Sequence, residues 1–373
     1  MSFDVFGNPT RRRILQQLAS LGVVTSNAGL LGMGTSSAAL AAGDDPVNLT
    51  LGVWPAPKSV APSAVLERFV ASRDNVTAEA VEGSQVQSFQ KIQASLAVNP
   101  DEPWAQLGMF NAQRFADGAV ADMWHALDPE KIPNLKNLHE GLQPADGRGA
   151  FWIADLCGIM YNKRLVSTPP TSWYDLFDSV HKGKVTVWQA PAFSVNGVAL
   201  FTRLEGGDES NMEPGISLFE KAAAAGQFTG FHGSADQLRK MFQTDQAAIG
   251  IGFQGIVQPW IDDGDEIGFV IPKGGTFVFP EGWQMVKGLK GRTYDLACEL
   301  LNEMLSAETV TEYSVLNPTI PLVRGAKVPE KYANIPTFSL DGLDEPIVFD
   351  WTKMASSLEK TTELWNDRVA TKL

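Results

Sequence analysis

The 373-residue sequence contains few of the residues that build metal centres and disulfide scaffolds: two cysteines and four histidines. HExxH, Cys-x-x-Cys, GxxxxGK[ST] and GxSxG are all missing, which removes the common zinc, P-loop and serine-hydrolase motifs. Cys157 and Cys298 lie among apolar residues, so we expect buried free thiols, with a disulfide as the alternative in an oxidising compartment. We therefore expect no catalytic residue, no metal site and no cofactor.

Long hydrophobic runs are also missing. The apolar stretch 18–40 is diluted by Gly, Ser and Thr, and no other segment approaches the ~20 apolar residues of a membrane span. Arginines at 11–13 precede this stretch and Ala39-Leu40-Ala41 ends it, an order typical of an export signal. The arginine cluster favours the twin-arginine route, and the alternative is a basic amphipathic helix. We predict that 1–41 is cleaved off and that the mature protein lies free in the periplasm, without membrane insertion.

The net charge is −13, and an acidic surface repels the phosphates of nucleic acids, so we expect no nucleic-acid partner. The length allows two domains. Short apolar segments alternate with amphipathic ones, which indicates α/β layers and a largely parallel sheet. The predicted strands span 47–53, 106–110, 151–161, 184–188, 247–253 and 267–271, and the predicted helices span 61–72, 88–97, 215–224, 234–243, 295–307 and 355–370.

Residues 250–255 (GIGFQG) formally match the dinucleotide-binding pattern GxGxxG after a predicted strand. The acidic residue that holds the ribose about twenty positions later is missing, because Asp262, Asp263 and Asp265 come too early. We interpret this segment as a tight strand-to-helix turn whose backbone amides face a cleft.

Three segments follow one another in a distinctive order: GIMYNK at 158–163, PPTSWYDLFD at 169–178 and KGKV at 182–185. Pro169 and Pro170 favour an extended approach, Ser172 can cap the next helix, and Gly183 suits the turn into a strand. This order closely resembles the family of bacterial extracellular solute-binding proteins that includes the spermidine/putrescine-binding proteins. The segment 127–135 resembles the part of the same family pattern that leads into these segments, and 248–253, 272–287 and 317–319 resemble later parts of it.

The resemblance implies a two-lobed periplasmic-binding-protein fold of type II, an α/β fold with a ligand cleft between discontinuous lobes. Lobe 1 would comprise 42–155 and 275–318, and lobe 2 would comprise 156–274 and 319–373. A monomer would close on a small-molecule ligand by a hinge motion and dock on the membrane permease subunits of an ABC importer.

Polyamine binders of this family hold ammonium groups with carboxylates and stack the carbon chain on aromatic rings. The aromatic half is partly present, but carboxylates are missing after the KGKV strand, where 188–193 reads WQAPAF, and the family's tyrosine before Pro-Thr is Asn317. We predict a small organic amine or cation as the ligand. The predicted ligand-binding residues are Trp54, Phe110, Trp152, Asp155, Trp188, Phe253, Glu281, Trp283 and Asn317.

Alternatives remain open at several of these positions. Asp155 could anchor a ligand cation, or it could be a carboxylate capped by backbone amides or paired with an arginine. Glu281 could instead be an exposed turn residue, and each tryptophan could belong to the core. A small anion such as a phosphonate or carboxylate could bind the amides of 252–255 with an arginine, Arg114 or Arg324.

The sequence also bears on three further functions. Iron would need a tyrosine pair near the cleft, and Tyr313 has no neighbouring tyrosine. A secreted α/β hydrolase with a dispersed Ser/His/Asp triad is the rival from a different class. A sensor partner that binds ligand without transport is the third reading.

Overall fold

The computed structural model describes residues 45–190, 194–340 and 346–373. The predicted export signal and its cleavage point lie outside these ranges, as do residues 191–193 of the WQAPAF segment. Residues 46–373 form one unit, and within the described ranges no helix is long and apolar enough to cross a membrane.

The predicted strands and helices are all present, with ends that differ by a few residues. The strands are β1 (Val47–Val53), β3 (Leu107–Asn111), β4 (Ala150–Asn162), β5 (Val185–Trp188), β7 (Ile249–Phe253) and β8 (Ile267–Val270). The helices are α2 (Val60–Ala71), α3 (Gln85–Val98), α6 (Glu213–Ala224), α7 (Ala235–Gln243), α9 (Gly291–Met304) and α11 (Trp351–Arg368).

Further elements were not predicted from the sequence. They are β2 (Val76–Glu82), β6 (Phe228–His232), β9 (Val278–Met285), β10 (Ile320–Pro321), α4 (Ala112–Val120), α5 (Ser194–Leu204), α8 (Gln254–Asp262), α10 (Ala307–Leu316) and short 3-10 turns at Pro133–Asn137, Glu140–Leu142, Trp173–Phe177, Ser179–His181, Glu330–Tyr332, Pro336–Phe338 and Ala370–Lys372. β9 escaped prediction because Pro280, Glu281 and Gly282 form a combination typical of turns.

The described strands join in one sheet, in the order β2-β1-β3-β9-β4-β7-β5-β6, with β8 and β10 also paired to β4. The prediction of a largely parallel sheet was wrong. β1 is parallel to β2 and β3, and β5 is parallel to β6 and β7, but every pairing made by β4 or β9 is antiparallel. β9 runs antiparallel to β3, β4 runs antiparallel to β7, and the two strands run antiparallel to each other, which makes the sheet mixed.

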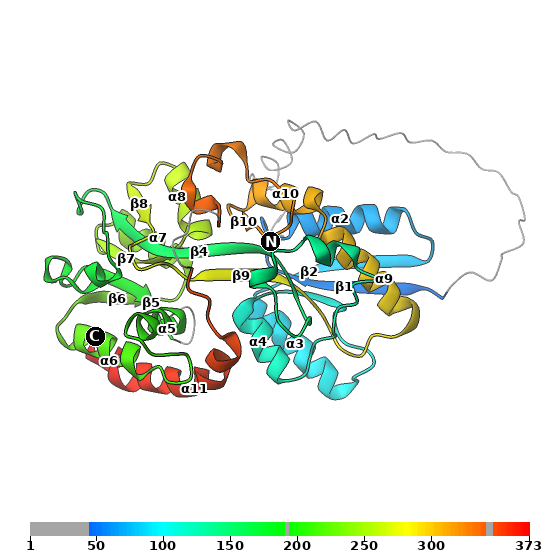
Figure 1. The fold of residues 1–373 in the computed structure, drawn as a ribbon, viewed down its shortest axis with the longest axis horizontal. Coiled ribbons are helices and arrows are strands. Elements are labelled where there is room, and N and C mark those ends of the chain that lie inside the picture. The colour runs from blue at the N-terminus through cyan, green and yellow to red at the C-terminus, as the bar shows by residue number, and fades with distance from the viewer. Residues whose placement is uncertain (1–44, 191–193, 341–345) are drawn as a thin grey trace, which may run out of the picture. The chain divides into compact units, whose positions relative to one another are not determined.

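β4 links the two parallel groups. Its first half, Ala150 to Leu156, pairs with β9, and its second half, from Cys157 onward, pairs with β7 and β8. Figure 1 shows β4 and β9 side by side between the β1–β3 group and the β5–β7 group. The middle of β4 is thus the place where the chain passes from one group of strands to the other.

Two hydrophobic cores flank this crossing. The first core draws its buried residues from 47–153 and 283–323, and the second core draws them from 157–279 and 349–369. Cys298 lies in the first core and Cys157 in the second, and both are buried and free, as predicted. Two local predictions are also confirmed: Ser172 caps the turn Trp173–Phe177, and Gly183 has a positive φ of 71° in the turn before β5.

Candidate ligand-binding site

A cavity of about 330 Å³ lies at the point where β4 changes partners. Its wall combines the middle of β4 and β9, the start of α8, the approach to α2 and the chain after α10. Five of the predicted ligand-binding residues lie together in it. The full lining is Trp54, Pro57, Lys58, Asp155, Phe253, Gly255, Ile256, Pro259, Phe279, Glu281, Leu316, Asn317, Pro318 and Thr319.

Asp155 lies in β4 opposite Phe279 of β9, two positions before Cys157, where the strand begins to pair with β7. Its Oδ1 accepts hydrogen bonds from the backbone N–H of Leu156 at 2.8 Å and of Gly255 at 2.9 Å. The strand-to-helix turn predicted at 250–255 is therefore present, and its Gly255 amide points at Asp155 rather than at open space. Asp155 is a carboxylate capped by backbone amides, and its other oxygen accepts no hydrogen bond from the described residues.

Burial raises the pKa of Asp155 to about 7. The hydrogen bond from Gly255 opposes this shift, the negative charge of Glu281 adds to it, and the positive charge of Lys58 and the Leu156 amide lower the pKa again. Near neutral pH this carboxyl group is therefore divided between its neutral and ionised forms. A cation placed beside it would favour the ionised form.

Glu281 is a buried residue of β9 with 4% of its surface exposed, so the alternative of an exposed turn residue was wrong. Strand pairing brings it to the face that carries the paired neighbours Asp155 and Phe279. Its carboxylate accepts a hydrogen bond from Lys58 Nζ, 2.9 Å from Oε2. The same ammonium lies 3.6 Å from the centre of the Trp54 ring.

The aromatic wall is formed by Trp54, Phe253 and Phe279. The indole N–H of Trp54 donates to the carbonyl of Met109 at 2.9 Å, which fixes the ring against the middle of β3. The rings of Phe253 and Phe279 lie 5.3 Å apart and belong to the second core. Asn317, at the end of α10, is buried and directs its amide Nδ2 to the carbonyl of Tyr313 at 3.0 Å.

The other four predicted residues lie elsewhere. Trp152 and Trp283 are fully buried in the first core, with ring centres 5.5 Å apart. Phe110 is fully buried against Phe89 and Trp124, and Trp188 packs on the ring of His232.

Arg114 and Arg324 are the two arginines named above as possible partners of an anionic ligand. Neither lines the cavity, and Arg114 forms an ion pair with Asp117 at 2.6 Å. Lys58 and Phe279 are among the cavity residues that were not predicted from the sequence. The signal that could have found Lys58 is its position four residues after the predicted Trp54.

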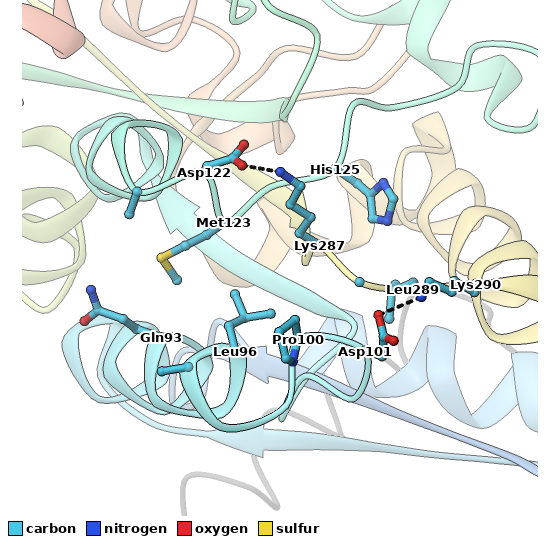
Figure 2. A pocket seen from close by; sticks show the side chains of 13 residues that line it. Gln93, Leu96, Pro100, Asp101, Asp122, Met123, His125, Lys287, Leu289 and Lys290 are labelled. Carbon is cyan, nitrogen blue, oxygen red and sulfur yellow. Dashed lines mark hydrogen bonds and ion pairs between the residues drawn. The ribbon is translucent and has the colours of Figure 1, made fainter.

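A larger cavity of about 690 Å³ lies away from this site, between α3 and the chain that follows β9 (Figure 2). Its charged groups are bound to each other: Lys287 pairs with Asp122, and Lys290 pairs with Asp101 at 2.7 Å. Its walls come from α3, the chain after α4 and the chain after β9, and none of the predicted ligand-binding residues lines it. We therefore place the candidate ligand site at the β4 crossing. The described ranges contain no group of three His, Cys, Asp or Glu residues suited to a metal ion.

The family of bacterial extracellular solute-binding proteins matches residues 64–339, and the chain belongs to this family. Among solved structures, an ABC transporter structure from Clostridium perfringens has a TM-score of 0.73 at 19% identity, covering 86% of this chain and 99% of that chain. Iron-bound HitA from Pseudomonas aeruginosa has a TM-score of 0.68 at 17% identity, covering 86% and 99%.

The spermidine/putrescine-binding protein PotD from Streptococcus pneumoniae has a TM-score of 0.65 at 18% identity, covering 85% and 99%. A search of curated protein sequences gave no match.

The two-lobed type II fold expected from the sequence is thereby confirmed. The protein is an extracellular solute-binding component of the kind that binds small molecules and works with ABC permease subunits. Its family implies an exported location. The spermidine/putrescine-binding protein is one structural neighbour among several with different ligands, so the fold leaves the ligand open.

Proposed function

We propose that this protein captures a small organic amine or quaternary cation in the periplasm and delivers it, as a monomer and without catalysis, to the permease of an ABC importer. The observation that carries the proposal is the pair of carboxylates, Asp155 and Glu281, on one face of an aromatic-lined cavity. Carboxylates and aromatic faces are the groups that attract ammonium ions.

The geometry supports a cation over a small anion. The Gly255 amide, which an anion would use, already donates to Asp155. The ammonium of Lys58 is held by Glu281, and Arg114 lies outside the cavity. An anion would therefore meet two carboxylates and no unengaged cationic side chain in the described lining.

The proposed lobe boundary after Asp155 falls one residue before β4 changes partners, and this supports closure at that point. A ligand that touches Gly255 on one side and Asp155 and Trp54 on the other would contact elements from both proposed lobes. Such a ligand binds the closed state more tightly than the open state, which is what drives closure.

The test is a thermal-shift screen of the protein from Ala42 onward against choline, tetramethylammonium, primary amines, polyamines, amino acids, phosphonates and carboxylates. Binding to the native state alone raises the melting temperature by mass action. We expect a rise with amines that Asp155→Asn reduces and that the exposed control Asp236→Asn leaves unchanged. A rise with anions alone overturns the cation proposal, and hydrolysis of a generic ester without any shift supports the hydrolase instead.

A further inference from the structure

The ammonium of Lys58 lies between the ring of Trp54 and the carboxylate of Glu281. Its Nζ lies 3.6 Å from the centre of the Trp54 ring and 2.9 Å from Glu281 Oε2. One face of an aromatic ring and one buried carboxylate together form a cation site. In this protein the site is filled by a side chain of the protein itself.

The charges of the cavity follow from this arrangement. Its described lining carries three ionisable side chains: Lys58, Asp155 and Glu281. Lys58 and Glu281 neutralise each other, and the Lys58 side chain keeps 27% of its surface exposed while that of Glu281 keeps 6%. Asp155 is therefore the one carboxylate of the described lining that has no cationic side chain within salt-bridge distance. It is the carboxylate that an added cation can pair with.

Asp155 and Glu281 are also close enough to serve one small ligand. Asp155 is paired with Phe279 across the antiparallel strands, and Glu281 lies two residues further along β9. Diagonal neighbours of this kind are separated by roughly 7–8 Å. Without Lys58, a short diamine could place one ammonium at each carboxylate.

We propose that Lys58 is the specificity-determining residue of the cavity: its tethered ammonium fills the subsite of Trp54 and Glu281, so the cavity takes a ligand with a single ammonium group, held at Asp155, and rejects diamines. This inference rests on the proposed cation-binding function. It gives the cavity a selectivity different from that of a polyamine binder, since a second ammonium would face the positive charge of Lys58 at short range.

The experiment compares n-butylamine with putrescine, which have the same carbon chain and differ by one ammonium group. Calorimetric titration is run on the wild type and on Lys58→Met. We expect the wild type to bind n-butylamine more tightly than putrescine, and Lys58→Met to shift the ratio of the two affinities toward putrescine by about 10-fold or more.

Two control variants distinguish an effect of the Lys58 charge on ligand selectivity from an effect of a disturbed fold. Lys91 lies over the Trp104 ring at 4.8 Å outside the cavity, so Lys91→Met should leave the ratio unchanged. Lys58→Met/Glu281→Gln removes both charges, leaves no unpaired buried carboxylate at Glu281, and should not gain putrescine binding. Gain of putrescine binding in the double variant as well would show that space rather than charge decides, and would overturn the inference.

The outcomes distinguish the two proposals. If the wild type binds putrescine as tightly as n-butylamine, or if Lys58→Met leaves the ratio unchanged, the role of Lys58 is overturned while the cation function stands. If neither the wild type nor Lys58→Met binds any amine, the proposed function fails and this inference fails with it.

Discussion

The backbone N–H of Gly255 donates a 2.9 Å hydrogen bond to Oδ1 of Asp155, which ties the first turn of α8 to the middle of β4. A carboxylate at a helix N-terminus is favoured by the helix dipole and by the unsatisfied amides there. Burial acts in the opposite direction and raises the pKa of Asp155 to about 7. Asp155 thus has two properties at once: it caps the first turn of α8, and it is a titratable group in the ligand cavity.

The first prediction concerns the stability of the ligand-free protein as a function of pH. The pKa of Asp155 is about 7 in the folded protein and 3.8 in the reference state, so the folded state holds the proton more tightly. The stabilising contribution of the neutral carboxyl is full below about pH 4 and is lost as pH rises through 7. The difference in unfolding free energy between wild type and Asp155→Asn should fall by up to about 1.4 kcal/mol per pH unit over this range.

Urea unfolding at half-unit pH steps measures this difference directly. Asparagine keeps an oxygen that accepts from Gly255, so the cap survives while the titration is removed. The exposed Asp236→Asn is the matched control for the Asp-to-Asn substitution itself. A constant difference for Asp155→Asn would contradict the raised pKa.

The second prediction concerns the space at Gly255. A Cβ atom at this position would lie 2.7 Å from Asp155 Oδ2 and 3.0 Å from the carbonyl oxygen of Pro318. Gly255→Ala should therefore lower the unfolding free energy by about 1–3 kcal/mol and weaken ligand binding, because the cavity wall must shift. Gly141→Ala is the control, since its Cβ would make only an ordinary contact of 3.5 Å with His139. Equal melting temperatures for the two variants would show that the α8 turn yields without cost.

The sequence predicts most of the long strands correctly, but only some of the residues that line the cavity. The sequence predicts β1, β4 and β7 because each is a continuous apolar segment, which is typical of a buried strand. The sequence does not predict β9, because the pairing of this strand with β3 and β4 overrides the preference of Pro280 and Gly282 for turns.

The site shows the same limit. Trp54 and Asp155 could be singled out because a tryptophan ends a strand and an acid interrupts an apolar one. The sequence could not tell them from Trp152 and Trp283, whose rings face the first core, because alternation along a strand does not say which face meets a cavity. Lys58 was missed because its role depends on Glu281, 223 residues away.

The third prediction concerns the unequal exposure of the ion pair. The Glu281 side chain is 6% exposed, whereas that of Lys58 is 27% exposed. Lys58→Met removes the cation from a nearly buried carboxylate and should lower the unfolding free energy by about 2–3 kcal/mol. Glu281→Gln leaves a lysine that can turn to water and should cost about 1 kcal/mol or less. Chemical denaturation of both variants measures the order, and a larger loss for Glu281→Gln would contradict it.

The fourth prediction concerns His232, which is fully buried and packs beside the ring of Trp188. Its Nδ1 lies 2.9 Å from Thr186 Oγ1, and burial lowers its pKa from 6.5 to about 3. The folded state therefore resists protonation, so the stability contribution is present above about pH 6.5 and is lost as pH falls toward 3.

This dependence has the opposite sign to that of Asp155, and the two effects offset each other between about pH 4 and 6.5. Substituting one of the two residues should therefore reveal the pH dependence that the other contributes to the unfolding free energy. In Asp155→Asn the unfolding free energy should rise with pH across this window relative to wild type, and in His232→Gln it should fall with pH relative to wild type. His139→Gln, at an exposed position, is the matched control for the His-to-Gln substitution itself. Parallel curves for His232→Gln and wild type would mean that the buried imidazole is not held neutral, and that protons reach it without unfolding.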